Sequence, residues 1–467
     1  MTMHRDEKAG EVLGGSFRDP SGFLFHHDDF LYRQINKSYQ ANYEFFASSG
    51  LYDELLKQQL LIPHHEVDLT PAKPELAFKV IQPDPVRFIS YPYEWSFSML
   101  KDAALATLKI QQIALDFGMS LKDASAYNIQ FHNGKPTLID TLSFEKYEEG
   151  GAWVAYGQFC RHFLAPLALM SLRDIRFGLM FRTCIDGIPL DFASANLPGR
   201  TRFLNLGLAT HIHLHARFER RHGADSEAAE TRGKGVSLSA MRGLIVNLES
   251  TIRGLKWRPV GTEWGDYYDF TNYTDDSIGK KREIIERFLD KIKPSTVWDL
   301  GANTGAFTRI ATDRGIAAVA MDIDPAAVEK NYRQVAANGE KSLLPLVMDL
   351  RNPSPGIGWA NREREAFAER GPVDAVFALA LIHHVVISNN VPLMVVAEYF
   401  STLCEHLIIE FVPKEDSQVK RLLSTREDIF PDYNESGFEK AFSSTFKLVN
   451  KETIEGSLRT MYLMSKR

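Results

Sequence analysis

Residues 297–305 read V-W-D-L-G-A-N-T-G, and they are the most informative stretch of this 467-residue chain. An apolar segment runs into Asp299 and then into a turn that contains Gly301 and Gly305. Glycine lacks a Cβ, so the backbone at these two positions can turn sharply and approach a ligand closely. A strand, a glycine-rich turn and a following helix form the layout of a nucleotide-type cofactor site in a doubly wound sheet.

Strand-like and helical segments alternate from residue 277 onward, which predicts βαβ units and a parallel sheet. The predicted strands are 296–300, 317–321, 343–348, 373–379 and 406–411, followed by an edge hairpin near 446–449 and 460–464. The predicted helices are 277–293, 304–314, 325–338, 361–370 and 391–404. We therefore predict an α/β domain with a doubly wound, Rossmann-like sheet over residues 265–467.

Polar side chains follow three of these predicted strands. Asp322 ends the second strand. Its distance in sequence from the glycine-rich loop is about that of an acidic residue that accepts hydrogen bonds from ribose hydroxyls. Asp349 ends the third strand, where a carboxylate can reach an adenine amino group. His383 and His384 follow the fourth strand in A-L-I-H-H. These side chains are predicted to gather at the carboxyl edge of the sheet, where open α/β sheets bind ligands.

This ordered series resembles the class I S-adenosylmethionine-dependent methyltransferases. The wider C-terminal half, which includes Y-Y-D-F-T-N-Y, A-L-I-H-H, I-I-E-F-V-P-K-E-D-S and S-L-R-T-M-Y-L-M, is similar to bacterial methyltransferases related to the nodulation protein NoeA. The resemblance implies S-adenosyl-L-methionine as cofactor and binding roles for Asp299, Gly301, Asn303, Gly305, Asp322 and Asp349. Asn303 stands where the family often has a glycine, and asparagine tolerates left-handed backbone better than most residues. The alternative, an NAD-binding domain, lacks its G-x-G-x-x-G fingerprint, because the loop reads G-A-N-T-G. The resemblance fixes no substrate.

Methyl transfer requires alignment of the reactants and a proton acceptor from the protein. No N-P-P-Y motif follows the fourth strand, which argues against glutamine amides and base amines as acceptors. His383 or His384 could act as general base toward a hydroxyl or an amine, or could brace a loop. Glu410 ends the fifth strand and could accept a proton, hold a cationic group or brace a loop. Tyr273 is expected either to close over the cofactor or to seal the domain junction.

The N-terminal half carries a second pattern within residues 120–144. Asp123 and Asn128 have the D-x-x-x-x-N spacing, and a short hairpin with an N-G-K turn leads to L-I-D at Asp140. This segment resembles the catalytic segment of protein kinases and aminoglycoside-type phosphotransferases. The departures are that no G-x-G-x-x-G loop is present and that Arg33 is a poor replacement for a phosphate-pairing lysine. The alternative is a helical substrate-recognition domain in which these residues are turn residues.

Domain organisation follows from these patterns. We expect an N-terminal α+β region over residues 1–150, which resembles a diverged kinase-like fold. A mainly helical continuation is predicted over 151–256, with a linker near 222–236. The stretch H-I-H-L-H within that continuation is predicted to be helical rather than to form a metal site, and no metal is expected.

The composition and net charge of the chain limit the classes of function that are expected for it. The net charge of -6, from 54 basic and 60 acidic residues, argues against broad binding to nucleic acid. No apolar run reaches the roughly 20 residues of a membrane span, and no secretory segment is visible, so we expect a cytoplasmic protein. The prediction is an S-adenosylmethionine-dependent methyltransferase acting on an oxygen or nitrogen atom, whose N-terminal domain selects the substrate. The acceptor is expected to be a small molecule, a glycan or lipid precursor, or a protein. The alternatives are a bifunctional enzyme or phosphotransferase, and a non-catalytic cofactor-binding protein.

Overall fold

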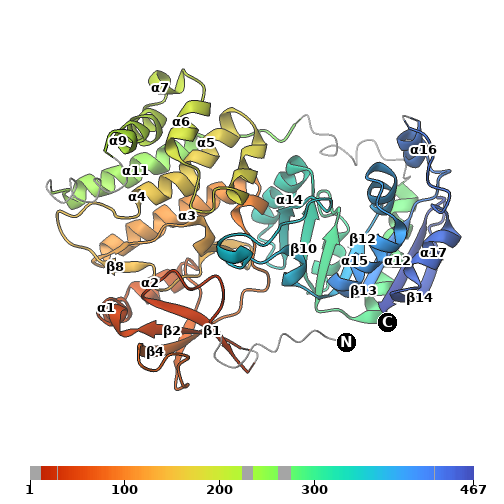
Figure 1. Cartoon of the computed structure of the whole chain (residues 1–467), viewed down its shortest axis with the longest axis horizontal. Coiled ribbons are helices and arrows are strands. Elements are labelled where there is room, and N and C mark those ends of the chain that lie inside the picture. The colour runs from red at the N-terminus through yellow and green to blue at the C-terminus, as the bar shows by residue number, and fades with distance from the viewer. Residues whose placement is uncertain (1–11, 29, 223–234, 261–274, 425) are drawn as a thin grey trace. The chain divides into compact units, whose positions relative to one another are not determined.

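The computed structural model describes residues 12–28, 30–222, 235–260, 275–424 and 426–467. The chain divides into two compact units (Figure 1). Unit 1 comprises residues 1–257 together with 356–364, and unit 2 comprises 258–355 and 365–467. The assignment of 356–364 to unit 1 was not predicted, because these residues lie between two strands of unit 2 in the sequence. Each unit is described by itself below.

Unit 2 is built on a seven-stranded sheet with the order β11-β10-β9-β12-β13-β15-β14. The strands are β9 (Thr296–Leu300), β10 (Ala317–Asp322), β11 (Leu343–Val347), β12 (Val373–Ala378), β13 (Cys404–Phe411), β14 (Phe446–Thr453) and β15 (Thr460–Lys466). The first five strands of the order are parallel, and β15 runs antiparallel to both β13 and β14. All seven predicted strands are confirmed, and the late pair forms the predicted edge hairpin.

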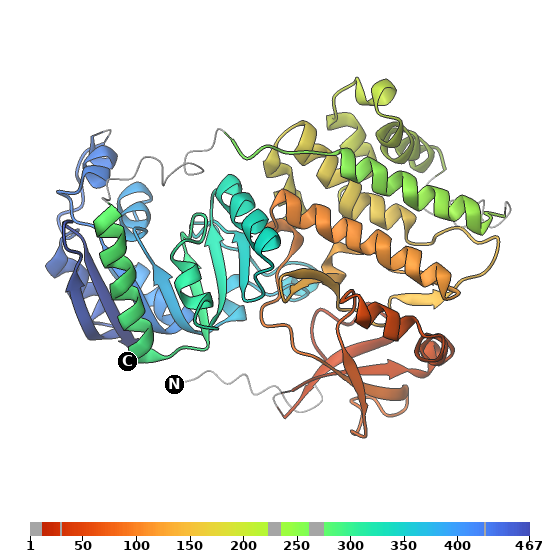
Figure 2. The same ribbon diagram turned by 180° about the vertical axis from the view of Figure 1, so that it is seen from behind.

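Helices cover both faces of this sheet, with α12 (Asp275–Ile292) on one face and α15 (Leu393–Leu403) on the other (Figures 1 and 2). The helix α14 (Pro325–Asn338) follows β10, and Asp324 caps its first turn by accepting a hydrogen bond from the backbone NH of Ala326. One face of the sheet packs on α12 through a continuous apolar cluster that includes Ile285, Phe288, Val297, Phe377 and Ile408.

Two predicted helices of unit 2 differ from the structure. The helix expected over 304–314 is only α13 (Thr308–Thr312), because Gly305 adopts a left-handed φ of 76° and belongs to the preceding loop. The prediction of a helix over 361–370 was wrong. Two short 3-10 turns, Trp359–Asn361 and Phe367–Arg370, replace it, and positive φ angles at Ala360 and Asn361 interrupt the helical path.

Unit 1 begins with a four-stranded antiparallel sheet of order β1-β2-β4-β3. Its strands are β1 (Gly22–His27), β2 (Phe30–Asn36), β3 (His64–Val67) and β4 (Ala77–Pro83), with α1 (Gln40–Ser48) and α2 (Leu51–Lys57) inserted after β2. The 20-residue helix α3 (Phe97–Asp116) follows, and it buries most of its apolar side chains.

The segment that resembles a phosphotransferase lies directly after α3. The strand β5 (Met119–Leu121) pairs with β8 (Phe144–Lys146), and between them β6 (Ile129–His132) and β7 (Lys135–Leu138) form the predicted hairpin. Asn133 and Gly134 turn this hairpin with φ angles of 52° and 76°, as an N-G turn requires. Helices dominate the rest of unit 1 up to α11 (Leu238–Gly254), which packs on α3. The N-terminal half is therefore α+β and mainly helical.

In the described part of the chain, no helix combines the length and the apolarity needed to cross a bilayer.

Candidate functional site

The loop after β9 forms a cradle of left-handed residues at the carboxyl edge of the unit 2 sheet. Gly301, Asn303 and Gly305 have φ angles of 80°, 50° and 76°. Asn303 thus adopts the left-handed conformation that was expected of it. A Cβ on Gly305 would lie 2.6 Å from the side-chain nitrogen of Asn331, so this position has no room for a side chain. The loop is held to the sheet because the backbone NH of Gly301 donates to the carbonyl of Met321 over 2.8 Å.

Asp299 lies beneath this loop with one oxygen paired and the other unpaired. Its Oδ2 accepts a hydrogen bond from the Thr308 hydroxyl over 2.6 Å, and its Oδ1 is buried without a hydrogen-bond partner among the described residues. Burial raises the pKa of Asp299 to about 7, and the Thr308 hydrogen bond and the nearby Lys281 charge oppose that rise. An unpaired buried acceptor is costly, so this oxygen is suited to receive a donor from a ligand.

Asp322 connects the end of β10 to the cradle. Its two oxygens accept hydrogen bonds from the backbone NH groups of Asn303 and Asp324, each over 2.8 Å. Burial raises the pKa of Asp322 to about 6 despite these hydrogen bonds, which lower it. A carboxylate has roughly four lone-pair sites, so Asp322 retains the capacity to accept ligand hydroxyls.

Asp349 lies at the same sheet edge, because β10 and β11 are parallel and Asp322 is in register with Val347. Arg351 holds the Asp349 carboxylate with two hydrogen bonds, of 2.9 Å from Nε and 3.0 Å from Nη2. The side chain of Asp349 is 30% exposed, which leaves it accessible to a ligand from the solvent side. Arg351 also reaches the side-chain oxygen of Asn389 over 3.4 Å, which links Asp349 to the segment after β12.

The two histidines after β12 are neighbours whose ring centroids are 4.1 Å apart. His383 is 2% exposed, and its Nδ1 is buried without a hydrogen-bond partner among the described residues. Burial, the adjacent His384 and the charge of Arg459 hold the pKa of His383 well below its ordinary value. Burial and Arg459 also lower the pKa of His384 to about 4. Both rings are therefore neutral at physiological pH, and their surroundings disfavour protonation.

Glu410 lies at the carboxyl end of β13, as predicted, but it is fully buried between two cations. Lys281 on α12 donates to Oε2 over 2.6 Å, and Arg459 donates to Oε1 over 3.3 Å. Arg459 in turn donates to Asp416 over 2.8 Å. Both oxygens of Glu410 are engaged, so this geometry is that of a bracing carboxylate rather than of a group that binds a cationic substrate.

Sequence reasoning missed four side chains that hold the site: Lys281, Thr308, Arg309 and Arg459. A signal for Lys281 was present, because it occupies the same helical stripe as Ile284, Ile285 and Phe288 and so faces the core. Arg309 ties the cradle to α14, because it donates to the Thr304 carbonyl over 2.8 Å and to the side-chain oxygen of Asn331 on α14 over 3.0 Å. No local pattern marks Thr308 or Arg459.

Tyr273 and its neighbours Tyr267 and Tyr268 lie outside the described residues, so their predicted role stays a prediction.

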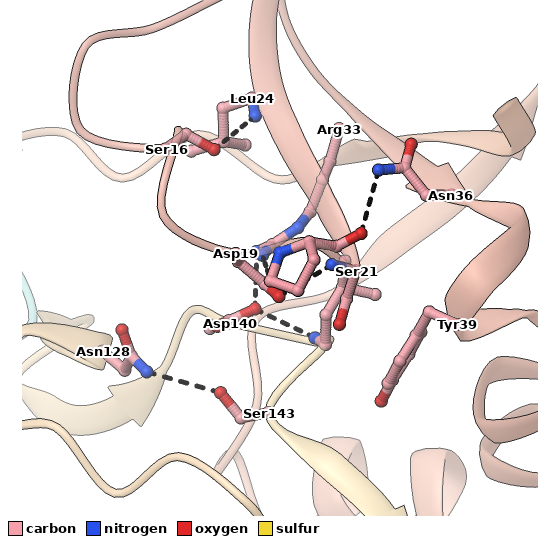
Figure 3. Close-up of polar contacts among 12 residues, drawn as sticks. Ser16, Asp19, Ser21, Leu24, Arg33, Asn36, Tyr39, Asn128, Asp140 and Ser143 are labelled. Carbon is pink, nitrogen blue, oxygen red and sulfur yellow. Dashed lines mark hydrogen bonds and ion pairs between the residues drawn. The ribbon is translucent and has the colours of Figure 1, made fainter. Parts of the chain in front are cut away.

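A second polar cluster lies in unit 1, where β2 meets the segments after β5 and β7 (Figure 3). Arg33 on β2 donates to Asp140 over 2.6 Å and lies 3.7 Å from Asp19. Asp123 accepts a hydrogen bond from the backbone NH of Ser125 and a further one from the side chain of Asn128. Burial and the charge of Asp140 raise the pKa of Asp123. The three residues singled out in the N-terminal sequence pattern therefore share one cluster with Arg33.

The H-I-H-L-H stretch of unit 1 has structural hydrogen bonds. His211 uses both ring nitrogens, with the Tyr156 hydroxyl at 2.8 Å and the Asn247 side chain at 2.7 Å. His213 does the same with the hydroxyls of Ser194 and Thr201, each at 2.8 Å. These rings brace the packing between helices.

No family model matches this chain. Among solved structures, the magnesium protoporphyrin IX methyltransferase of Synechocystis PCC 6803 with bound SAH is 16% identical, with a TM-score of 0.30, covering 44% of this chain and 93% of that one. The bifunctional kinase-methyltransferase WbdD is 16% identical with a TM-score of 0.29, covering 43% of this chain and 42% of that one. The N-methyltransferase NodS from Bradyrhizobium japonicum WM9 is 9% identical with a TM-score of 0.29, covering 41% and 97%.

A much stronger similarity covers both units. The nodulation protein NoeA of Rhizobium meliloti (strain 1021) is 39% identical over 463 residues, which cover 96% of this chain and 95% of that protein. The similarity to NoeA-related proteins predicted from the sequence is thereby confirmed, and this chain belongs to the NoeA family.

Proposed function

We propose that the protein is an S-adenosylmethionine-dependent methyltransferase whose cofactor site is the cradle of unit 2. The observation that carries this proposal is the convergence of Asp299, Asp322 and Asp349 with a left-handed loop at one edge of the sheet.

The residues present fit this cofactor. Gly301, Asn303 and Gly305 give the loop the left-handed backbone of a tight cofactor turn, and the Oδ1 of Asp299, which has no hydrogen-bond partner among the described residues, would accept a donor from the methionine part. Asp322 would accept the ribose hydroxyls, and Asp349 the adenine amino group. When bound, S-adenosylmethionine supplies an activated methyl group. The chain itself contributes alignment, exclusion of water and acceptance of a proton.

His383 and His384 are the candidates for that proton acceptor because of their position after β12 at the carboxyl edge. Their lowered pKa values make both rings weak bases in the ligand-free protein. His384 is partly exposed, whereas His383 is buried, so His384 is the better placed to meet an acceptor hydroxyl or amine. Glu410 is proposed to brace this edge through Lys281 and Arg459. The acceptor is proposed to be a small molecule, a glycan or lipid precursor, or a protein in the cytoplasm, selected by unit 1.

A calorimetric titration of the full chain with S-adenosylhomocysteine tests the cofactor assignment. We expect saturable binding that Asp322→Ala weakens by about 1–3 kcal/mol, because charged hydrogen bonds to ribose are lost. Folded protein that shows no binding at high micromolar ligand would overturn the proposal. Binding without methyl transfer to any fraction of a cell extract would favour the non-catalytic alternative.

A second candidate function, phosphoryl transfer in unit 1, is supported by the cluster of Arg33, Asp123, Asn128 and Asp140. A small antiparallel sheet that precedes a helical part, with a cation on the sheet reaching the second aspartate, is compatible with a diverged kinase-like fold. It predicts magnesium-dependent binding of ATP that Asp140→Ala abolishes. A thermal-shift measurement without any response to Mg-ATP would contradict it.

A further inference from the structure

We propose that Arg33 and Lys122 form a phosphate subsite in unit 1 and that the carboxylate of Asp19 competes with phosphate for it. This inference rests on the second candidate function above, because it concerns the same cluster. Neither the sequence pattern nor the similarity to NoeA assigns a role to Asp19 or Lys122.

Two cations from different elements flank the Asp19 carboxylate. Arg33 approaches from β2, with its Nη2 3.7 Å from Oδ2, and Lys122 approaches from the segment after β5, with its Nζ 3.9 Å from Oδ1. Figure 3 shows the Arg33 side chain directed at Asp19 and Asp140. Arg33 and Lys122 therefore define a position that attracts an anion, and Asp19 supplies that anion from within the chain.

The contacts of Asp19 with these cations are loose. Distances of 3.7 Å and 3.9 Å exceed those of charge-assisted hydrogen bonds, which are about 2.7–2.9 Å. The firm hydrogen bond of Asp19 is local, since its Oδ1 accepts from the backbone NH of Ser21 over 2.8 Å. Asp19 thus provides charge compensation, whereas the firm contacts of the two cations go to other groups, from Lys122 to the Ser21 hydroxyl over 2.6 Å and from Arg33 to Asp140 over 2.6 Å.

Arg33 retains a donor that its neighbours do not use. Arg33 is 8% exposed, and its Nε is buried without a hydrogen-bond partner among the described residues. Its Nη1 is committed to Asp140 over 2.6 Å. A phosphate oxygen could accept from the remaining edge of the guanidinium, because the planar fork of arginine matches phosphate geometry.

Phosphate bound with a divalent cation fits the surrounding groups better than a simple carboxylate ligand does. Asp140, Asp123 and the amide of Asn128 supply oxygens of the kind that Mg²⁺ prefers. Within the described residues no group of three or more His, Cys, Asp or Glu side chains is arranged to hold a metal ion. Magnesium commonly binds through one or two carboxylates plus substrate phosphates, so cation and phosphate are expected to bind together here.

The loop that carries Asp19 is anchored next to that residue. Arg18 donates to Oε1 of the nearly buried Glu363 from Nε over 3.1 Å and from Nη2 over 2.8 Å. This contact fixes the side chain next to Asp19. For phosphate to reach the two cations, the Asp19 carboxylate has to move away and give up its hydrogen bond from the backbone NH of Ser21.

Calorimetric titration of the full chain with Mg-ATP and with magnesium pyrophosphate tests this inference. We expect Asp19→Asn to bind both ligands about fivefold to tenfold more tightly than wild type, because one competing charge is removed. Asp68→Asn, an exposed substitution in the same unit with the same change in net charge, should bind as wild type does. Lys122→Gln should weaken binding of both ligands, and circular dichroism checks that each variant is folded.

The outcomes separate the two proposals. Wild type that binds Mg-ATP while Asp19→Asn binds it no more tightly would overturn the role of Asp19 and leave the phosphotransferase alternative standing. If the protein binds Mg-ATP but not magnesium pyrophosphate, and if Lys122→Gln leaves the affinity for Mg-ATP unchanged, the phosphate subsite is overturned. If neither wild type nor Asp19→Asn binds either ligand with magnesium, the second candidate function fails together with this inference.

Discussion

Replacing Asp299 by asparagine is expected to stabilise unit 2 at pH 8 while it weakens binding of S-adenosylhomocysteine. Asp299 is buried, one of its oxygens has no partner among the described residues, and burial raises its pKa from 3.8 to about 7. At pH 8 the Asp299 carboxylate is charged in the folded chain, and its burial makes this charge energetically unfavourable. Asparagine has almost the same shape and carries no charge.

The magnitude follows from the pKa. A rise of about 3 units corresponds to about 4 kcal/mol at 1.36 kcal/mol per unit, which is an upper limit on the gain. We expect about 2–4 kcal/mol, since the amide must also find an acceptor for its NH₂ group. Because the folded pKa lies above the unfolded one, the cost of Asp299 is absent below pH 3.8 and complete above about pH 7. The stability difference between variant and wild type should therefore grow from pH 5 to pH 8.

Hydrogen exchange of peptides from β9 and β12, measured with urea unfolding between pH 5 and pH 8, reports on unit 2 separately from unit 1. Thr308→Val is the matched control, because it removes the hydroxyl that stabilises the charged form of Asp299. It should destabilise unit 2 more at pH 8 than at pH 5. A pH-independent difference for Asp299→Asn, or lower stability at pH 8, would refute the reasoning. Calorimetry should show at least a tenfold loss of ligand affinity, about 1.4 kcal/mol.

Three other results are expected. Lys281→Met should destabilise unit 2 by about 3–5 kcal/mol in urea unfolding, because it breaks a buried pair with Glu410. Lys280→Met on the same helix is the control, and a loss of stability below about 1 kcal/mol relative to that control would contradict a buried ionic brace. Gly305→Ala should lower both the melting temperature and the affinity for S-adenosylhomocysteine, because its Cβ would lie 2.6 Å from Asn331; an unchanged affinity would place the ligand elsewhere. Affinity for S-adenosylhomocysteine in wild type should rise from pH 5 to pH 7 as the Asp322 carboxylate, whose pKa is about 6, loses its proton; the same rise in Asp322→Asn would assign it to another group.

The sequence predicted the sheet of unit 2 because each strand is an apolar run that ends at a polar residue or a turn. It also predicted the left-handed state of Asn303, since few residues other than asparagine can replace glycine there. It did not predict the break at 358–361, where positive φ angles at Ala360 and Asn361 end what composition suggests is helix. Nor did it assign residues 356–364 to unit 1, because that depends on contacts between segments far apart in the chain.

Asp299 and Glu410 show why the position of a strand-end carboxylate predicts where it lies but not what it does. Both end central parallel strands and both are buried at the same edge, so the sequence treats them alike. Glu410 meets Lys281 and Arg459, which arrive from α12 and from the segment before β15, and its charge is compensated within the chain. Within the part of the chain that the structure describes, Asp299 receives a single hydroxyl and keeps an unpaired oxygen. Because compensation depends on partners far away in sequence, only the fold separates the carboxylate suited to a ligand from the one that braces the sheet.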